Sequence, residues 1–250
     1  MTKLFVTLGV LILLKKLKMM KVEIWSDVMC PFCYIGKRKF ENALAQFPQK
    51  DKVEVVWKSF QLNPDLVTDP SKNTIEHLAE VKGWSLTQAK EMSDHVSGLA
   101  EKVGLKYDFD KAVVANSFDA HRFSCFAKHK GLQDAAEERL FKAYFTEGKN
   151  TADHETLIHL GVEIGLKADE VREMLNSNAY ADEVRQDIYE AQQVGVRGVP
   201  FFVLGQKYAI SGAQETPLFL EALNKTWEEV GQTTPSVVEG AVCTPDGECD

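Results

Sequence analysis

Cys30 and Cys33 are the side chains whose type and spacing most directly suggest chemistry, because they form the motif CPFC. A strand-like run ends shortly before them, and a helix-like run follows. At the start of a helix, unpaired backbone N–H groups and the helix dipole favour negative charge. A cysteine placed there has a lowered pKa and is a good nucleophile. We therefore expect Cys30 to attack disulfides and Cys33, one turn later, to attack the mixed disulfide that results.

A metal site and an inert disulfide are the other interpretations of this pair. A structural zinc site needs four ligands, usually from two close pairs. The other close pair, Cys243 and Cys249, stands more than 200 residues away. A disulfide within CPFC closes so small a loop that it restricts the unfolded chain little. The sequence therefore favours redox chemistry and predicts no metal.

Composition describes an ordinary globular chain. It has 250 residues, of which 44% are hydrophobic and 26% charged, and a formal net charge of -8. This charge argues against a nucleic-acid partner and against an anionic membrane surface. Five cysteines are too few for a disulfide scaffold.

The elements around CPFC predict an α/β unit. Lys21–Ser26 and Val53–Phe60 read as strands, and Pro31 to about Phe47 reads as a helix between them, with Pro31 suited to its first turn. A strand–helix–strand order gives a parallel pair with a right-handed crossover.

Helical periodicity then dominates from about Asn73 to Asn178 before strands resume at Pro200–Leu204 and Lys207–Ile210. A last helix spans Thr216–Val230. The expected organisation is an α/β domain over 21–66 and 180–230, an all-helical inserted domain over 67–179, an extension over 1–20, and a C-terminal arm over 231–250.

Two motifs far apart in the sequence together resemble a known fold. CPFC after a strand and GVPFFV opening a late strand, with a helical insertion between them, resemble the thioredoxin fold in its DsbA-like form. The resemblance implies a cis bond between Val199 and Pro200, with Pro200 lying against the nucleophile Cys30 and the resolving Cys33. It also implies that the Val199 backbone binds an extended substrate peptide, as an added strand would. The residues between the cysteines, Pro31 and Phe32, are the other expected substrate contacts.

Four segments narrow the resemblance: SDVMCPFCYIGKRKFE, SFQLNPD, NSFDAHR and ISGAQ are similar to the FrnE-like branch of the DsbA family. DsbA enzymes of the periplasm have histidine where Phe32 stands, which implies that this pair is less oxidising. Protein or small disulfides are then the expected substrates. No tightly bound cofactor is implied, and glutathione enters as a co-substrate.

A rival function follows from relatives of the same branch. These are 2-hydroxychromene-2-carboxylate isomerases and kappa-class glutathione transferases, which have serine or a similar residue in place of Cys30 and bind glutathione beside the cis-proline. The alternative is therefore a glutathione-dependent isomerase or transferase. Retention of both cysteines favours disulfide exchange.

Other candidate residues have two interpretations each. Cys243 and Cys249 flank TPDGE, whose turn brings them together. They form either a stapled tip or a second redox pair that exchanges with CPFC. Asp27 either tunes a cysteine thiol or relays its proton, or it is a turn residue at the end of a strand.

The segment around NSFDAHR and the serine of ISGAQ are the remaining candidates. Asn116, His121 and Arg122 either line a cleft, where Arg122 would hold a carboxylate, or belong to a helix cap and a solvated face. Ser211 is a further cleft candidate. Cys125 is expected to pack as a small hydrophobic residue.

The first 20 residues bear on localisation. The apolar stretch Leu4–Leu14 is too short for a membrane span. Lys15, Lys16 and Lys18 follow it, and positive charge there opposes export. We therefore expect the cytoplasm and no membrane association, with export as the alternative if residues 1–20 act as a signal peptide.

Overall fold

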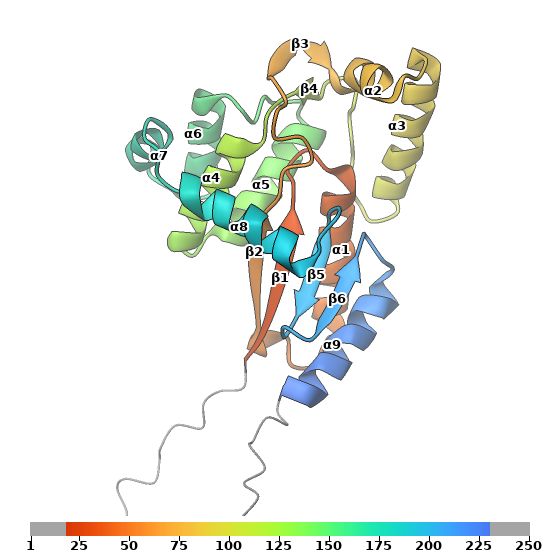
Figure 1. Ribbon diagram of the computed structural model, residues 1–250, viewed down its shortest axis with the longest axis vertical. Helices are drawn as coiled ribbons and strands as arrows, with labels where there is room; N and C mark the ends of the chain where they lie inside the picture. Colours follow the sequence, from red (N-terminus) through yellow and green to blue (C-terminus); the bar gives the residue numbers. More distant parts are fainter. Residues whose placement is uncertain (1–18, 231–250) are drawn as a thin grey trace, which may run out of the picture.

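A four-stranded sheet forms the centre of the computed structural model, which describes residues 19–230 (Figure 1). The strand order is β2-β1-β5-β6. β1 is parallel to β2 and antiparallel to β5, and β6 is antiparallel to β5. The strands are β1 (Met20–Ser26), β2 (Val53–Ser59), β5 (Phe201–Leu204) and β6 (Tyr208–Ser211).

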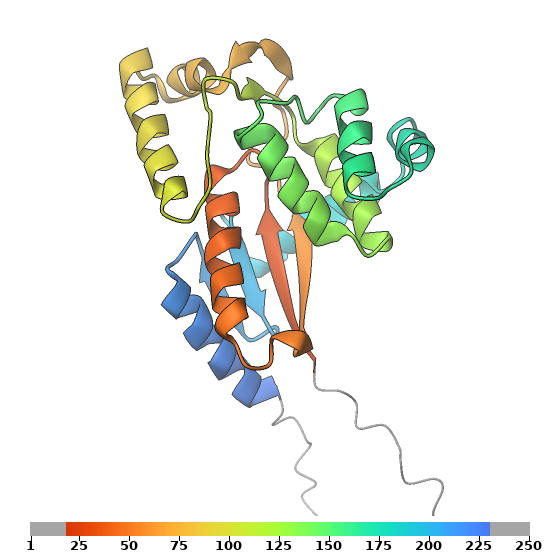
Figure 2. The same cartoon turned by 180° about the vertical axis from the view of Figure 1, so that it is seen from behind.

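Helices cover both faces of this sheet (Figures 1 and 2). α1 (Pro31–Gln46) and α9 (Thr216–Val230) pack together on one face, and α8 (Ala181–Val194) lies against the other. The Phe40 ring of α1 contacts two other rings. Its centroid lies 5.6 Å from that of Phe202 in β5 and 5.8 Å from that of Phe219 in α9. The order βαβ followed by ββα confirms the predicted thioredoxin fold.

The insertion between β2 and α8 lies beyond one end of the sheet (Figure 1). It contains α2 (Thr74–Lys82), α3 (Leu86–Glu101), α4 (Phe118–His129), α5 (Gln133–Phe145), α6 (His154–Glu163) and α7 (Ala168–Leu175). It also contains an antiparallel pair, β3 (Asp69–Asn73) and β4 (Val113–Val114), which the all-helical expectation missed. β3 has the sequence DPSKN and is largely exposed, so no alternation of apolar residues marks it as a strand.

Within residues 19–230, no helix has both the length and the apolar character needed to cross a membrane.

Candidate active site

Cys30 and Cys33 lie where β1 passes into α1. Cys30 is the N-cap of α1, and its backbone N–H donates to the carbonyl of Asp27 over 3.0 Å. Cys30 is 5% exposed and Cys33 is 0% exposed, and both are free thiols. A substrate can therefore reach Cys30 first, which agrees with its predicted role as nucleophile and with Cys33 as the resolving thiol.

The chemistry of Cys33 follows from its burial. Burial raises the pKa of the Cys33 thiol well above its ordinary value, and the neighbouring Cys30 raises it further. The Ser26 hydroxyl and the backbone N–H of Asp27 offset part of this shift. Cys33 therefore rests as a protonated thiol and must lose its proton before it can attack a mixed disulfide.

The Val199–Pro200 segment completes the wall beside Cys30. Its peptide bond is cis, as the resemblance implies. The Cys30 thiol donates to the Val199 carbonyl with 3.5 Å between Sγ and O. On its other side, Pro200 packs closely against α1 at Gly36. A Cβ at Gly36 would stand 2.9 Å from Pro200 Cγ, so the absence of a side chain there lets Pro200 approach the helix. The structure thus brings together Cys30, Cys33 and Pro200, three residues that the sequence predicted as the catalytic site.

Asp27 is fully buried and organises the loop before Cys30. Its Oδ2 accepts a hydrogen bond from the Leu62 N–H over 2.7 Å, and its Oδ1 accepts a longer one from Met29 over 3.4 Å. His121 Nε2 of α4 lies 3.4 Å from Oδ1. Asp27 is therefore a structural residue of the loop that leads into α1, and it also links this loop to His121 of α4.

Tyr107 is a site residue that the sequence did not reveal. Its hydroxyl donates to the carbonyl of Pro31 over 2.8 Å, inside CPFC. Its ring stacks on Phe145 and Tyr34, with centroids 4.7 and 6.2 Å apart. Tyr107 comes from the segment between α3 and β4, 76 residues from Pro31, and no local pattern distinguishes it from other core aromatics.

A cavity of about 560 Å³ opens beside Cys30, between the CPFC loop and the insertion. Its walls are mostly apolar, with His77 and Lys82 among the lining residues. Phe32, 41% exposed, also lines it. The other lining residues include Met29, Leu62, Leu78, Val81, Met92, Val96, Phe109 and Tyr144.

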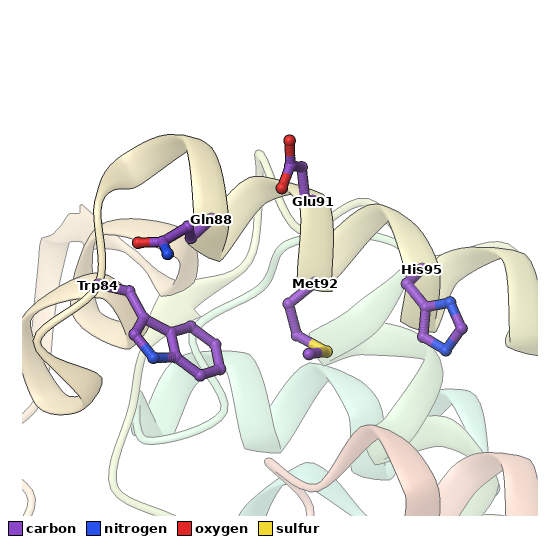
Figure 3. A pocket seen from close by; sticks show the side chains of 5 residues that line it. All are labelled: Trp84, Gln88, Glu91, Met92 and His95. Atoms are coloured by element: carbon purple, nitrogen blue, oxygen red, sulfur yellow. The ribbon is translucent and has the colours of Figure 1, made fainter.

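A second, shallower groove of about 420 Å³ lies on the α2–α3 corner (Figure 3). Figure 3 shows Trp84, which precedes α3, beside Met92 and His95 on the same side of that helix. Met92 also lines the cavity beside Cys30. The apolar surface therefore continues from the thiol onto the corner of the insertion.

Arg122 does not line a cleft. It is 5% exposed, and its guanidinium donates to the carbonyls of Met174, Ser177 and Ala179 and to the Asp119 carboxylate. Neither prediction for Arg122 is correct: it does not hold a substrate carboxylate in a cleft and it does not lie on a solvated face, because these four acceptors of the protein itself surround it in the interior.

Asn116 is structural as well, and Ser211 does not line the Cys30 cavity. Asn116 Oδ1 accepts from the Phe118 N–H at the start of α4, which supports the cap interpretation. Its Nδ2 donates to the carbonyls of Pro64 and Leu66. Ser211 is exposed at the end of β6 and is absent from the described lining of the Cys30 cavity. Cys243 and Cys249 lie outside the described residues, so their predicted role stays a prediction.

Comparison with known proteins agrees with this geometry. A family model for the DSBA-like thioredoxin domain matches residues 21–224. The uncharacterised protein YwbO of Bacillus subtilis is 30% identical over 211 residues, which cover 81% of this chain and 95% of YwbO. The crystal structure of a probable DsbA oxidoreductase from Streptomyces coelicolor is 41% identical, with a TM-score of 0.81 over 92% of this chain and 98% of that one.

A more distant likeness concerns the fold alone. The structure of a 2-hydroxychromene-2-carboxylate isomerase has a TM-score of 0.61 at 15% identity, over 84% of this chain and 98% of that one. The family match, by contrast, includes CPFC, the insertion and the Val199–Pro200 segment within one alignment. The chain belongs to the DsbA family of thioredoxin-fold proteins.

Proposed function

We propose that this protein is a thiol–disulfide oxidoreductase of the FrnE-like branch, acting on disulfides in extended polypeptides. The observation that carries the proposal is the position of Cys30, which caps α1, contacts the Val199 carbonyl and lies in the wall of an apolar cavity. A nucleophilic thiol in this position can meet a disulfide whose flanking side chains are buried beside it.

The reaction proceeds by two exchanges. The Cys30 thiolate attacks one sulfur of the substrate disulfide, and the substrate's S–S bond breaks with its electron pair on the other sulfur. That sulfur takes up a proton and leaves as a thiol. Cys33 then loses its proton and attacks Cys30, releasing the second substrate thiol. The substrate is reduced by two electrons, and Cys30-Cys33 is oxidised to a disulfide.

The surroundings of Cys30 favour a polypeptide substrate. An extended chain running past Val199 can hydrogen-bond to its backbone, as an added strand does. The apolar cavity and the exposed Phe32 ring can then take up large side chains next to the substrate cysteine. Phe32 in place of histidine supports a reductase or isomerase role, with glutathione as the small thiol that recycles the pair.

Two variants test the assignment. Cys30→Ser should lose insulin reduction and refolding of a scrambled disulfide protein. Cys33→Ser should still attack and should accumulate as a mixed disulfide, visible as a mass increase that dithiothreitol removes. Full activity of Cys30→Ser would show that the assignment is wrong.

The cavity also suits an aromatic small molecule, and this observation keeps the glutathione-dependent isomerase as the second candidate. Its test is a chromene-carboxylate isomerase assay. Turnover that needs glutathione and persists in Cys30→Ser would favour the isomerase over the oxidoreductase.

A further inference from the structure

A buried pair of opposite character joins the loop before Cys30 to α4. Asp27 is 0% exposed and His121 is 2% exposed, and Oδ1 and Nε2 of these residues are 3.4 Å apart. A buried carboxylate is costly to maintain unless a positive charge or hydrogen-bond donors compensate it. Besides its two backbone N–H donors, Asp27 has His121 as its ion-pair partner within the described residues.

The groups that face His121 come from three other parts of the chain. They are Asp27 before α1, the backbone of Phe60 after β2, and Glu137 of α5. Glu137 is itself buried and accepts a hydrogen bond from Ser124 Oγ over 2.5 Å. Burial disfavours the charged imidazole, but Asp27, and then Glu137 and Phe60, outweigh it, so the pKa of His121 is raised. The histidine therefore tends to hold a proton beside the carboxylate.

The pair is connected to both cysteines through the main chain of Asp27. The Asp27 carbonyl accepts from the Cys30 N–H, and the Asp27 N–H stabilises negative charge on Cys33. The Asp27 carboxylate also acts toward the cavity. Burial raises the pKa of Tyr144, which lines the cavity with Cys30, and the charge of Asp27 raises it further. The charge of Asp27 therefore acts on a residue of the cavity that Cys30 also lines.

We propose that His121 is a positioning residue for the resolving step: its proton balances the Asp27 carboxylate and so controls when Cys33 can become a thiolate. Without that proton, a negative charge on Cys33 would add to an uncompensated carboxylate on Asp27, whose main chain contacts the CPFC segment, in an interior that screens charge poorly. With it, the proton leaves Cys33, Cys33 attacks Cys30, and the released substrate sulfur takes up a proton. This inference rests on the proposed exchange reaction.

The first test separates the two steps of a single turnover. Reduced protein is mixed with excess glutathione disulfide across a range of pH. The attack of Cys30 is timed in a Cys33→Ser background, and release of the second thiol is timed with CPFC intact. His121→Gln should move the midpoint of the resolving step upward by about one pH unit, which lowers its rate about tenfold below the midpoint. The attack rate should change much less.

Two further variants make this result specific. His129→Gln is the matched control, because His129 lies on the same helix but is exposed and pairs with Glu183. It should leave the midpoint unchanged. Asp27→Asn removes the charge that His121 balances, so adding His121→Gln to it should cause no further shift. An unchanged midpoint in His121→Gln would overturn the inference, as would an equal shift in His129→Gln or a full shift in the Asp27→Asn background.

A second measurement uses the native sequence and needs no turnover. If His121 influences Cys33, then the charge on Cys33 must influence His121 equally. NMR of the His121 ring should show a step at the pH where Cys33 loses its proton in the dithiol form, and no such step in the disulfide form, which has no ionisable Cys33. Identical behaviour in the two forms, including no titration in either, would overturn the inference. Cys30 can still attack disulfides in that case, so the proposed function would survive.

Discussion

The two parts of the insertion meet the thioredoxin unit in different ways. The first part, the α2–α3 pair, has a small apolar cluster of its own around Ile75, Ala79 and Ala89, and only the later part of α3 reaches the main core. The second part, the α4–α7 bundle, contributes Phe123, Phe141 and many other side chains to the main core.

The two parts also differ in the side chains that they expose and bury. The α2–α3 pair exposes Val81, Trp84, Leu86 and Met92, and some of these side chains line the cavity beside Cys30. The α4–α7 bundle instead buries polar groups, among them His121 and Arg122. The comparison teaches that the bundle packs into the core and places buried charged side chains there, whereas the α2–α3 pair contributes exposed apolar side chains to the Cys30 cavity.

The largest expected effect concerns the buried polar groups of the bundle. Arg122→Ala leaves the carbonyls of Met174, Ser177 and Ala179 and the carboxylate of Asp119 without this partner. Breaking such a buried charged network should lower the free energy of unfolding by about 3–5 kcal/mol. Urea unfolding measures this, with the exposed Arg185→Ala as a control expected within about 0.5 kcal/mol. Equal stabilities of the two variants would contradict the division of roles.

A pair of glycines extends the comparison by adding one methyl group to α1 of the thioredoxin unit and one to the α2–α3 pair. In Gly36→Ala the new Cβ would stand 2.9 Å from Pro200 Cγ and 3.5 Å from the Ala213 Cβ. This overpacking should cost about 1–3 kcal/mol and slow disulfide exchange, because it pushes Pro200 away from α1.

The matched change is Gly98→Ala in α3, where the new Cβ would have no described atom within 4 Å apart from its chain neighbours and the backbone of its own helix. Alanine is the better helix former, so this variant should be stabilised by up to about 1 kcal/mol. Thermal unfolding measures the stability of the two variants, and a disulfide-exchange assay measures their activity. A Gly98→Ala protein that is destabilised as much as Gly36→Ala would show that the α2–α3 pair is packed as tightly as the core.

Substitutions in the exposed apolar lining of the Cys30 cavity should change substrate binding more than stability. Met92 and Leu218 are both 43% exposed, but only Met92 lines the Cys30 cavity. Met92→Ser should raise KM for a protein disulfide about threefold to tenfold, which corresponds to at most about 1.4 kcal/mol of lost apolar contact. Leu218→Ser on α9 should not raise it. Kinetics with a protein disulfide and with glutathione disulfide test this, and an effect confined to the small substrate would count against the polypeptide surface.

The smallest expected effect is a pH dependence of stability at the junction of α5 and α1. Burial opposes ionisation of Glu138, but Arg38, the Tyr34 hydroxyl and Lys37 outweigh it, so the pKa of Glu138 is lowered. A lowered pKa in the folded state adds stability above the unfolded value of about 4.5, and that stability is lost as the pH falls through the folded value.

Partial exposure of these charges limits the contribution to less than about 1 kcal/mol. Glu138→Gln should therefore lose less stability than the unchanged protein between pH 6 and pH 3. Urea midpoints at both pH values provide the measurement, and parallel losses would argue against a role for this carboxylate.

The sequence by itself determined the elements that depend on neighbouring residues. The motif CPFC was placed correctly between a strand and a helix, because Pro31 and the apolar periodicity act within a few residues. The capping box of Ser85 and Gln88 is present at the start of α3 for the same reason. Gly205 and Gln206, both with φ near 57°, lie in the turn between β5 and β6, at the break between the two strands predicted over Pro200–Leu204 and Lys207–Ile210. The Val199–Pro200 segment was found from a family pattern and not from local physics.

Only the tertiary structure decided the partners of the buried polar groups. His121 lies against Asp27, and Tyr107 reaches the Pro31 carbonyl, across 94 and 76 residues of sequence. The period of 3.6 residues shows which residues share a face of α4, but it does not show which face is buried. Arg122 was therefore compatible with a cleft ligand and with a surface residue. Which face meets which neighbour depends on how the insertion packs on the sheet, and no interaction within a few residues encodes that choice.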